Sequence, residues 1–213
     1  MELLDQYIAE GEHTRQDFKF RIDEQKKIAR TLCAFANTEG GRLLIGVKDN
    51  GKIVGVDPQE EFFMIEGAAQ FFCKPEVSFK SKIHQSDHKM VLEILIEKDP
   101  NTFHSSPDDS GKWRMYMRID DQTLVVNKII ERVWKQKKNP LSRPEKFDEE
   151  ELGFLKTIGK NEPVTISKLY RASGLPLKRV DQLLVLFICW DLVEYNLSHE
   201  GVRYSLSVEK KKS

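Results

Sequence analysis

The chain has 213 residues and carries 34 Lys and Arg against 34 Asp and Glu, so its formal net charge is zero. Hydrophobic residues make up 39% and charged residues 32%, which is typical of folded domains and excludes a disordered chain. The balanced charge also excludes the strongly basic class of nucleic-acid-binding proteins, so any such binding must depend on a local patch.

Several features predict a cytoplasmic protein without a membrane partner. The longest apolar run, Leu183 to Trp190, is too short to cross a bilayer. The first five residues are acidic and lack the basic and apolar regions of a signal peptide. Three widely spaced cysteines, Cys33, Cys73 and Cys189, are best explained as reduced, buried thiols.

The first 138 residues predict a domain of mixed strands and helices. Apolar periodicity indicates helices over residues 2–10, 24–37, 58–72 and 125–137, and strands over 16–20, 43–47, 53–56, 77–83, 90–96 and 113–119. Asp49-Asn50-Gly51 predicts a hairpin turn between the second and third strands, and residues 99–112 predict a long loop. This order predicts an α+β fold in which helices pack on a mixed sheet.

Residues 139–147 predict a linker, and residues 148–213 predict a small second domain. Helices are expected over 148–158, 166–172 and 177–192, with the turn Ser173-Gly174 before the last. Two short strands, 193–196 and 202–206, would form a wing. Helix, helix, turn, helix and hairpin is the order of a winged helix-turn-helix.

One segment resembles a known family. The run from Phe35 to Val56, FANTEGGRLLIGVKDNGKIVGV, is similar to the signature of Schlafen-type AlbA-like domains. Glu12 and the triplet Asp17-Phe18-Lys19 match an acidic pattern near the start of that family, and Tyr116-Met117-Arg118 matches a later strand. The resemblance covers about residues 8 to 137. It implies the family fold for the first domain.

The resemblance implies two kinds of function. Bacterial members are usually described as DNA-binding proteins or transcriptional regulators, and some are labelled divergent ATPases. Animal members include endoribonucleases that cut structured RNA with three carboxylates and a divalent cation. Glu12, Asp17 and Asp49 match those acidic positions, although Asp17 replaces the commoner glutamate and is one methylene shorter.

The three carboxylates have two interpretations. Each lies next to an expected strand, so neighbouring strands could bring them together as ligands for Mg²⁺ or Mn²⁺ that activate water. Alternatively, Asp49 begins the Asp-Asn-Gly turn, and Glu12 and Asp17 are solvated. A catalytic site is therefore predicted only if the protein is a nuclease, and no cofactor is firmly indicated.

Basic residues near these positions are candidates for phosphate contacts. In the first domain they are Lys19, Arg42, Lys48, Lys52 and Arg118. Gly40-Gly41 would permit close backbone approach to a ligand, but the pair equally suits the end of a helix. In the second domain the candidates are Lys178, Arg179 and Arg203. The helix that would read bases, residues 177–192, is almost wholly apolar after Gln182, so packing or dimerisation is an equal alternative.

Two further enzyme or metal classes lack support in the sequence. ATP hydrolysis needs a phosphate-binding loop, and no G-x-x-x-x-G-K-[ST] occurs. His84 and His88 are four residues apart, but no Cys pair completes a zinc set.

The leading prediction is a nucleic-acid-binding protein, a bacterial-type transcriptional regulator that binds DNA or RNA and works as a homodimer. The alternatives are a metal-dependent endoribonuclease that uses Glu12, Asp17 and Asp49, and a scaffold whose winged domain binds protein.

Overall fold

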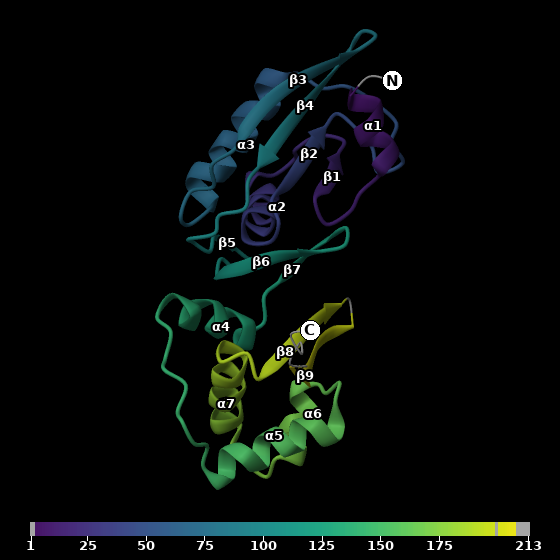
Figure 1. The fold of residues 1–213 in the computed structure, drawn as a ribbon. Coiled ribbons are helices and arrows are strands. Elements are labelled where there is room, and N and C mark those ends of the chain that lie inside the picture. Colours follow the sequence, from purple (N-terminus) through teal and green to yellow (C-terminus); the bar gives the residue numbers. More distant parts are fainter. Residues whose placement is uncertain (1–2, 199, 208–213) are drawn as a thin grey trace. The chain divides into compact units, whose positions relative to one another are not determined.

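The computed structural model describes residues 3–198 and 200–207, which form two compact units, Met1–Val126 and Asn127–Ser213 (Figure 1). The first unit contains the helices α1 (Leu3–Glu10), α2 (Gln25–Asn37) and α3 (Pro58–Phe72). Its strands are β1 (Gln16–Lys19), β2 (Gly41–Ile45), β3 (Lys80–Ser86), β4 (Lys89–Ile96), β5 (Ser105–Pro107), β6 (Trp113–Ile119) and β7 (Gln122–Val125). The expected α+β class, with a mixed sheet and packed helices, is confirmed.

The main sheet has the strand order β1-β2-β4-β3. β1 and β2 run parallel, with Asp17 opposite Leu43, whereas β4 is antiparallel to both β2 and β3. Side chains alternate between the two faces of a strand, so both faces of the central strands can be buried. Leu43 and Ile45 pack toward α2 and α3, and Leu44 packs toward α1. The apolar run of β2 thus serves two cores.

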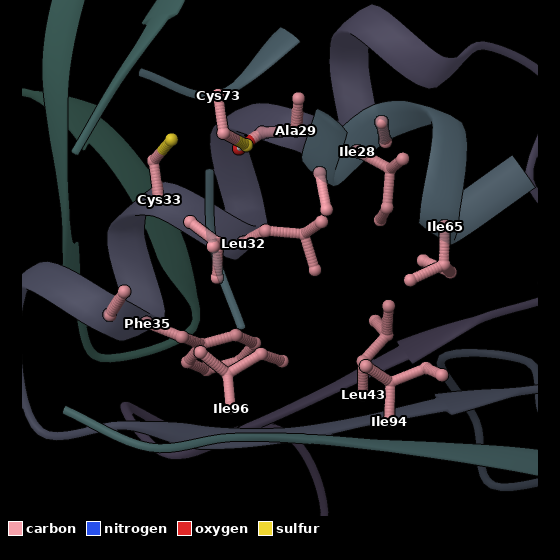
Figure 2. Packing of buried hydrophobic residues seen from close by; sticks show 14 of the residues in the cluster. Ile28, Ala29, Leu32, Cys33, Phe35, Leu43, Ile65, Cys73, Ile94 and Ile96 are labelled. Carbon is pink, nitrogen blue, oxygen red and sulfur yellow. The ribbon is translucent and has the colours of Figure 1, made fainter. Parts of the chain in front are cut away.

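The larger core lies between the sheet and helices α2 and α3 (Figure 2). Leu32 and Phe35 of α2 are completely buried there, together with Ile65 of α3 and Ile94 of β4. α2 forms because its apolar residues recur at helical spacing and nine of its positions are buried. Cys33 and Cys73 are free thiols buried in this core, as expected, while Cys189 is only half-buried.

A second sheet, β5-β6-β7, packs against α2. The buried Asn37 at the end of α2 connects them: its amide nitrogen donates to the carbonyl oxygens of His104 (2.8 Å) and Tyr116 (2.9 Å). Its amide oxygen accepts from the His104 backbone N–H at 2.7 Å. β5 and β7 lie in segments that the periodicity did not mark as strands.

The expected hairpin between residues 43–47 and 53–56 is replaced by a turn and a single bridge, Val47 to Ile53. The backbone N–H groups of Val54 and Gly55 both donate to the Gly46 carbonyl oxygen. The Val56 N–H donates to Met90 O at 2.9 Å. Residues 54–56 therefore turn away from β2 toward β4, and they do not form a second strand that pairs with β2.

The second unit contains α4 (Lys128–Lys138), α5 (Glu149–Asn161), α6 (Ile166–Ala172), α7 (Leu177–Cys189), β8 (Val193–Ser198) and β9 (Gly201–Leu206). Asp148 and Glu151 form a capping box that begins α5. The core includes Phe154, Phe187 and Tyr204, all buried.

The boundary between the units differs from the one expected after residue 138. α4 packs against α7 and belongs to the second unit. The cause is the apolar face of α4, on which Ile129, Ile130 and Val133 are buried. The predicted linker, residues 139–147, contains no helix or strand.

Candidate functional site

Arg118, expected to contact nucleic acid, is buried inside the first unit. Its side chain is 2% exposed and lies over the Phe35 ring, 5.0 Å from the ring centre. One terminal nitrogen is 3.4 Å from Asp17 Oδ1, and the other donates to the backbone oxygens of His13 and Gln16. This guanidinium joins β6 to β1, and it has no solvent-facing surface on which to hold a phosphate.

Asp17 is also buried and is held from two sides. Besides Arg118, the Lys19 ammonium group lies 2.7 Å from Asp17 Oδ2. Glu12 is nearby, and its carboxylate accepts a hydrogen bond from the Phe18 backbone N–H at 2.8 Å. Burial raises the pKa of Glu12, and the negative charge of Asp17 raises it further, whereas the Phe18 hydrogen bond lowers it.

The raised pKa of Glu12 predicts that Glu12→Gln slightly increases stability near neutral pH. A carboxyl group whose pKa is higher in the folded state destabilises the fold at pH values above that pKa, where it must ionise. The stability difference between variant and wild type should shrink as the pH falls through the raised pKa toward the ordinary value. Thermal melts between about pH 4 and pH 7 would measure it, across the range set by an ordinary Glu pKa. A variant that is less stable at neutral pH would show instead that the charge is needed.

Asp49 is exposed in the turn that follows β2. Across residues 3–198 and 200–207, no group of three His, Cys, Asp or Glu side chains is placed to hold a metal ion. Glu12 and Asp17 therefore lie near each other, and Asp49 is not grouped with them. The charge of Asp17 is balanced by Lys19 and Arg118. These residues do not fit the divalent-metal site expected of a nuclease.

Arg42 belongs to a second internal network. Its guanidinium lies over the Tyr7 ring, 3.2 Å from the ring centre. It donates to Gln16 Oε1 at 2.8 Å and to Glu93 Oε1 at 2.9 Å. The other oxygen of Glu93 is 2.6 Å from the buried His84 Nε2. Arg42 and His84 thus stabilise the packing around β2, β3 and β4.

Gly40 and Gly41 are required by the fold. Gly40 has φ +72°, and a Cβ there would lie 2.7 Å from the Ile96 carbonyl oxygen. A Cβ on Gly41 would lie 2.3 Å from a carbon of the Phe35 ring. Of the two interpretations of this pair, the backbone end of α2 and close packing account for both residues.

The other expected phosphate contacts of the first unit, Lys19, Lys48 and Lys52, lie where β1 and β2 end. Backbone N–H groups of Gly46 and Val47 donate to Lys19 O, which continues the parallel pairing beyond the strands. The following turn closes with hydrogen bonds from Gly51 N to Lys48 O (2.8 Å) and from Lys48 N to Lys52 O (3.0 Å). We call the surface at these strand ends the basic edge; it comprises Lys19, Phe20, Arg21, Lys48 and Lys52.

The basic edge combines an exposed aromatic ring with positive charge. Phe20 is 49% exposed, and the Lys48 ammonium and Arg21 guanidinium lie 5.6 and 5.9 Å from its ring centre. Arg21 is paired with Asp23 at 2.6 Å. Among the described residues, neither Lys48 nor Lys52 has an acidic side chain at ion-pair distance. The carboxyl ends of neighbouring parallel strands are a common location for ligand binding.

Comparison with known proteins supports the assignment of the first unit. The family model described as Schlafen, AlbA_2 matches residues 12–127, which is more than half of the chain. The chain belongs to this family. No curated protein matches it in sequence.

Two solved structures are similar to the chain. The DIP2311 protein from Corynebacterium diphtheriae is 18% identical with a TM-score of 0.45; the match covers 79% of this chain and 41% of that protein. The N-terminal domain of an ATP-dependent DNA helicase RecG-related protein from Nitrosomonas europaea is 21% identical with a TM-score of 0.40. That match covers 60% of this chain and 97% of the domain. The chain thus spans less than half the length of the first of these proteins.

Within the AlbA_2 domain, Phe20 and Arg21 belong to the basic edge but were not among the candidate contacts expected from the sequence. The available signal was the run Phe18-Lys19-Phe20-Arg21, in which aromatic and basic residues alternate. Phe18 is 1% exposed and belongs to the core beside α1, whereas Phe20 follows the end of β1 and projects into solvent. The sequence alone does not show where the strand ends.

Outside the AlbA_2 domain, two of the three basic residues expected to contact nucleic acid already have acidic partners. Arg179 pairs with Glu150 at 2.6 Å, and Arg203 pairs with Glu200 at 3.1 Å. Lys178 lines a hollow of about 690 Å³ between α4 and α7, together with Arg132 and Gln182. Asp181 at the start of α7 is held by Arg132 (3.1 Å) and by the Tyr170 hydroxyl (2.5 Å).

Among the described residues, none of the helices combines the length and apolar composition of a membrane span.

Proposed function

We propose that this AlbA_2 protein binds nucleic acid through the basic edge of its first unit. The supporting observation is a pair of exposed lysines on one turn, Lys48 and Lys52, neither of which has an acidic partner among the described residues. Lys48 also lies near the exposed Phe20 ring. The chain as a whole is neutral, so attraction of phosphates must depend on a local patch such as this one. Of the expected contacts, Lys19, Lys48 and Lys52 belong to this surface, and Arg42 and Arg118 support the fold behind it.

We further propose that the protein acts as a transcriptional regulator in which the second unit has the winged-helix form. The order α5, α6, α7 and the β8-β9 hairpin is consistent with that form. α4 packs against α7, and Arg179 and Asp181 near the start of α7 are paired within the unit. This arrangement favours a role of the second unit in assembly, such as a homodimer, over insertion of α7 into a DNA groove. The three-carboxylate nuclease is not proposed, because the residues it requires are not grouped.

The proposal predicts binding of the full chain that weakens steeply as salt increases. Counterions are released when lysines contact phosphates, so the logarithm of the association constant falls linearly with the logarithm of salt concentration. Fluorescence anisotropy with labelled DNA and RNA, each single-stranded and duplex, would measure the slope. If none of these probes binds at low salt, the proposal is wrong.

Lys48→Ala should weaken binding of all sequences alike and reduce the salt slope by about 1, as expected for loss of one phosphate contact. Lys98→Ala is the matched control. Lys98 is also exposed, but it follows the end of β4 that pairs with the start of β2, where Ile96 is opposite Gly41, whereas Lys48 follows the end of β2. Equal losses in the two variants would show that the basic edge is not the binding surface.

A further inference from the structure

Phe20 differs from the other strongly exposed phenylalanines of the first unit. Phe63 and Phe71 of α3 are 68% and 70% exposed. Within the described part of the chain, only Phe20 of these three has a cation near its ring, and it has two, Arg21 and Lys48. An isolated exposed aromatic residue needs no explanation, whereas a ring with two cations near it can make cation–π contacts.

The two cations contact the Phe20 ring only loosely. Their distances of 5.6 and 5.9 Å from the ring centre are at the outer limit of a cation–π contact, and half of the side chain remains exposed. Lys48 has no acidic partner among the described residues, and it lies on the same turn as Lys52. The half-exposed ring is therefore open to a planar ligand, and the Lys48 ammonium beside it, with Lys52 on the same turn, is available to negative groups of that ligand.

We infer that the basic edge binds single-stranded nucleic acid, with a base stacked on Phe20 and the adjacent phosphates held by Lys48 and Lys52. This inference rests on the proposed function and narrows its substrate class. In a duplex each base is already stacked between its neighbours, so the ring has no free base to contact. In a single strand the bases can turn outward onto aromatic side chains. Because every base has a flat face, the contact does not depend on sequence.

The test compares Phe20→Ala with Phe71→Ala in the full chain. The probes are oligothymidylate and oligouridylate of about 12 nucleotides, within the usual range of site sizes, and a DNA duplex of the same length. Phe20→Ala should weaken single-strand binding by roughly 5- to 100-fold, the equivalent of one lost stacking contact, and should change duplex binding little. Phe71→Ala removes a more exposed ring that has no cation near it among the described residues, and it should leave both affinities unchanged.

A second variant, Phe20→Trp, provides a spectroscopic readout of stacking. It keeps a flat ring, so single-strand affinity should be retained, and the added tryptophan emission should be quenched when the oligonucleotide binds. Duplex binding together with unchanged single-strand affinity in Phe20→Ala would overturn the inference and leave the proposed function standing. Absence of quenching in a Phe20→Trp protein that binds would also overturn it. If the wild type binds no probe, the proposed function fails as well.

Discussion

Arg118→Ala is expected to lower the free energy of unfolding by about 3–5 kcal/mol, the usual cost of removing one partner from a buried ion pair. Arg118 is 2% exposed at its side chain, and Asp17, its partner, is 5% exposed. Alanine would leave Asp17 with Lys19 alone and would remove one of the two donors to each of the His13 and Gln16 carbonyl oxygens. It would also leave a space over the Phe35 ring. Thermal and urea unfolding would measure the loss.

Arg114→Ala is the control for this change. Arg114 lies on the same face of β6, an even number of residues away, but its side chain is 31% exposed and pairs with Asp108. Exposed pairs contribute about 0–1 kcal/mol, so this variant should remain close to wild type. Arg118→Ala could instead fold with unchanged stability and lose only nucleic-acid binding. In that case Arg118 contacts nucleic acid, as the sequence suggested, and the structural role assigned to it is incorrect.

The contrast between Arg118 and Lys48 explains why the candidate site was only partly predictable. The residue types were correct, since both side chains are cations in segments that match the family pattern. Their roles depend on partners that the sequence does not place side by side. Asp17 and Arg118 are 101 positions apart, and only the tertiary packing that places β6 beside β1 brings them together. Lys48 stays exposed because its turn extends beyond the strands.

The fold was predictable where local patterns decide it. The helix over Pro58–Phe72 begins with an Asp57 cap and proline at its first position, and the strand Trp113–Ile119 alternates clearly. By contrast, α4 was expected in the first domain because the family resemblance extends to about residue 137. Its apolar face packs against α7, which lies some 40 residues later, so a tertiary contact determines its unit.

Gly41→Ala is expected to reduce the free energy of unfolding by about 1–3 kcal/mol, because overpacking a well-filled core has costs of this size. The added Cβ would lie 2.3 and 2.4 Å from two carbons of the Phe35 ring and 3.0 Å from the Arg15 carbonyl oxygen. Phe35 cannot move easily, because it is completely buried among Ile96 and other residues of the larger core (Figure 2). Gly153→Ala is the control: Gly153 lies in α5 with nothing near its Cβ, so alanine there should stabilise the helix by about 0.5–1 kcal/mol.

A double-mutant cycle with Phe35→Leu tests whether the clash is the cause. Leucine is smaller than phenylalanine and leaves room for the new methyl group, although the change itself removes buried surface and destabilises the fold. In the Phe35→Leu background, Gly41→Ala should therefore lose less stability than it does in the wild type. The expected coupling is about 0.5–3 kcal/mol, as found for residues in contact. If the two changes are additive, the methyl group does not meet Phe35, and the Arg15 carbonyl oxygen is the group that excludes a side chain at position 41. Urea unfolding of the four proteins measures this coupling, and equal m-values would show that all four unfold from similarly compact states.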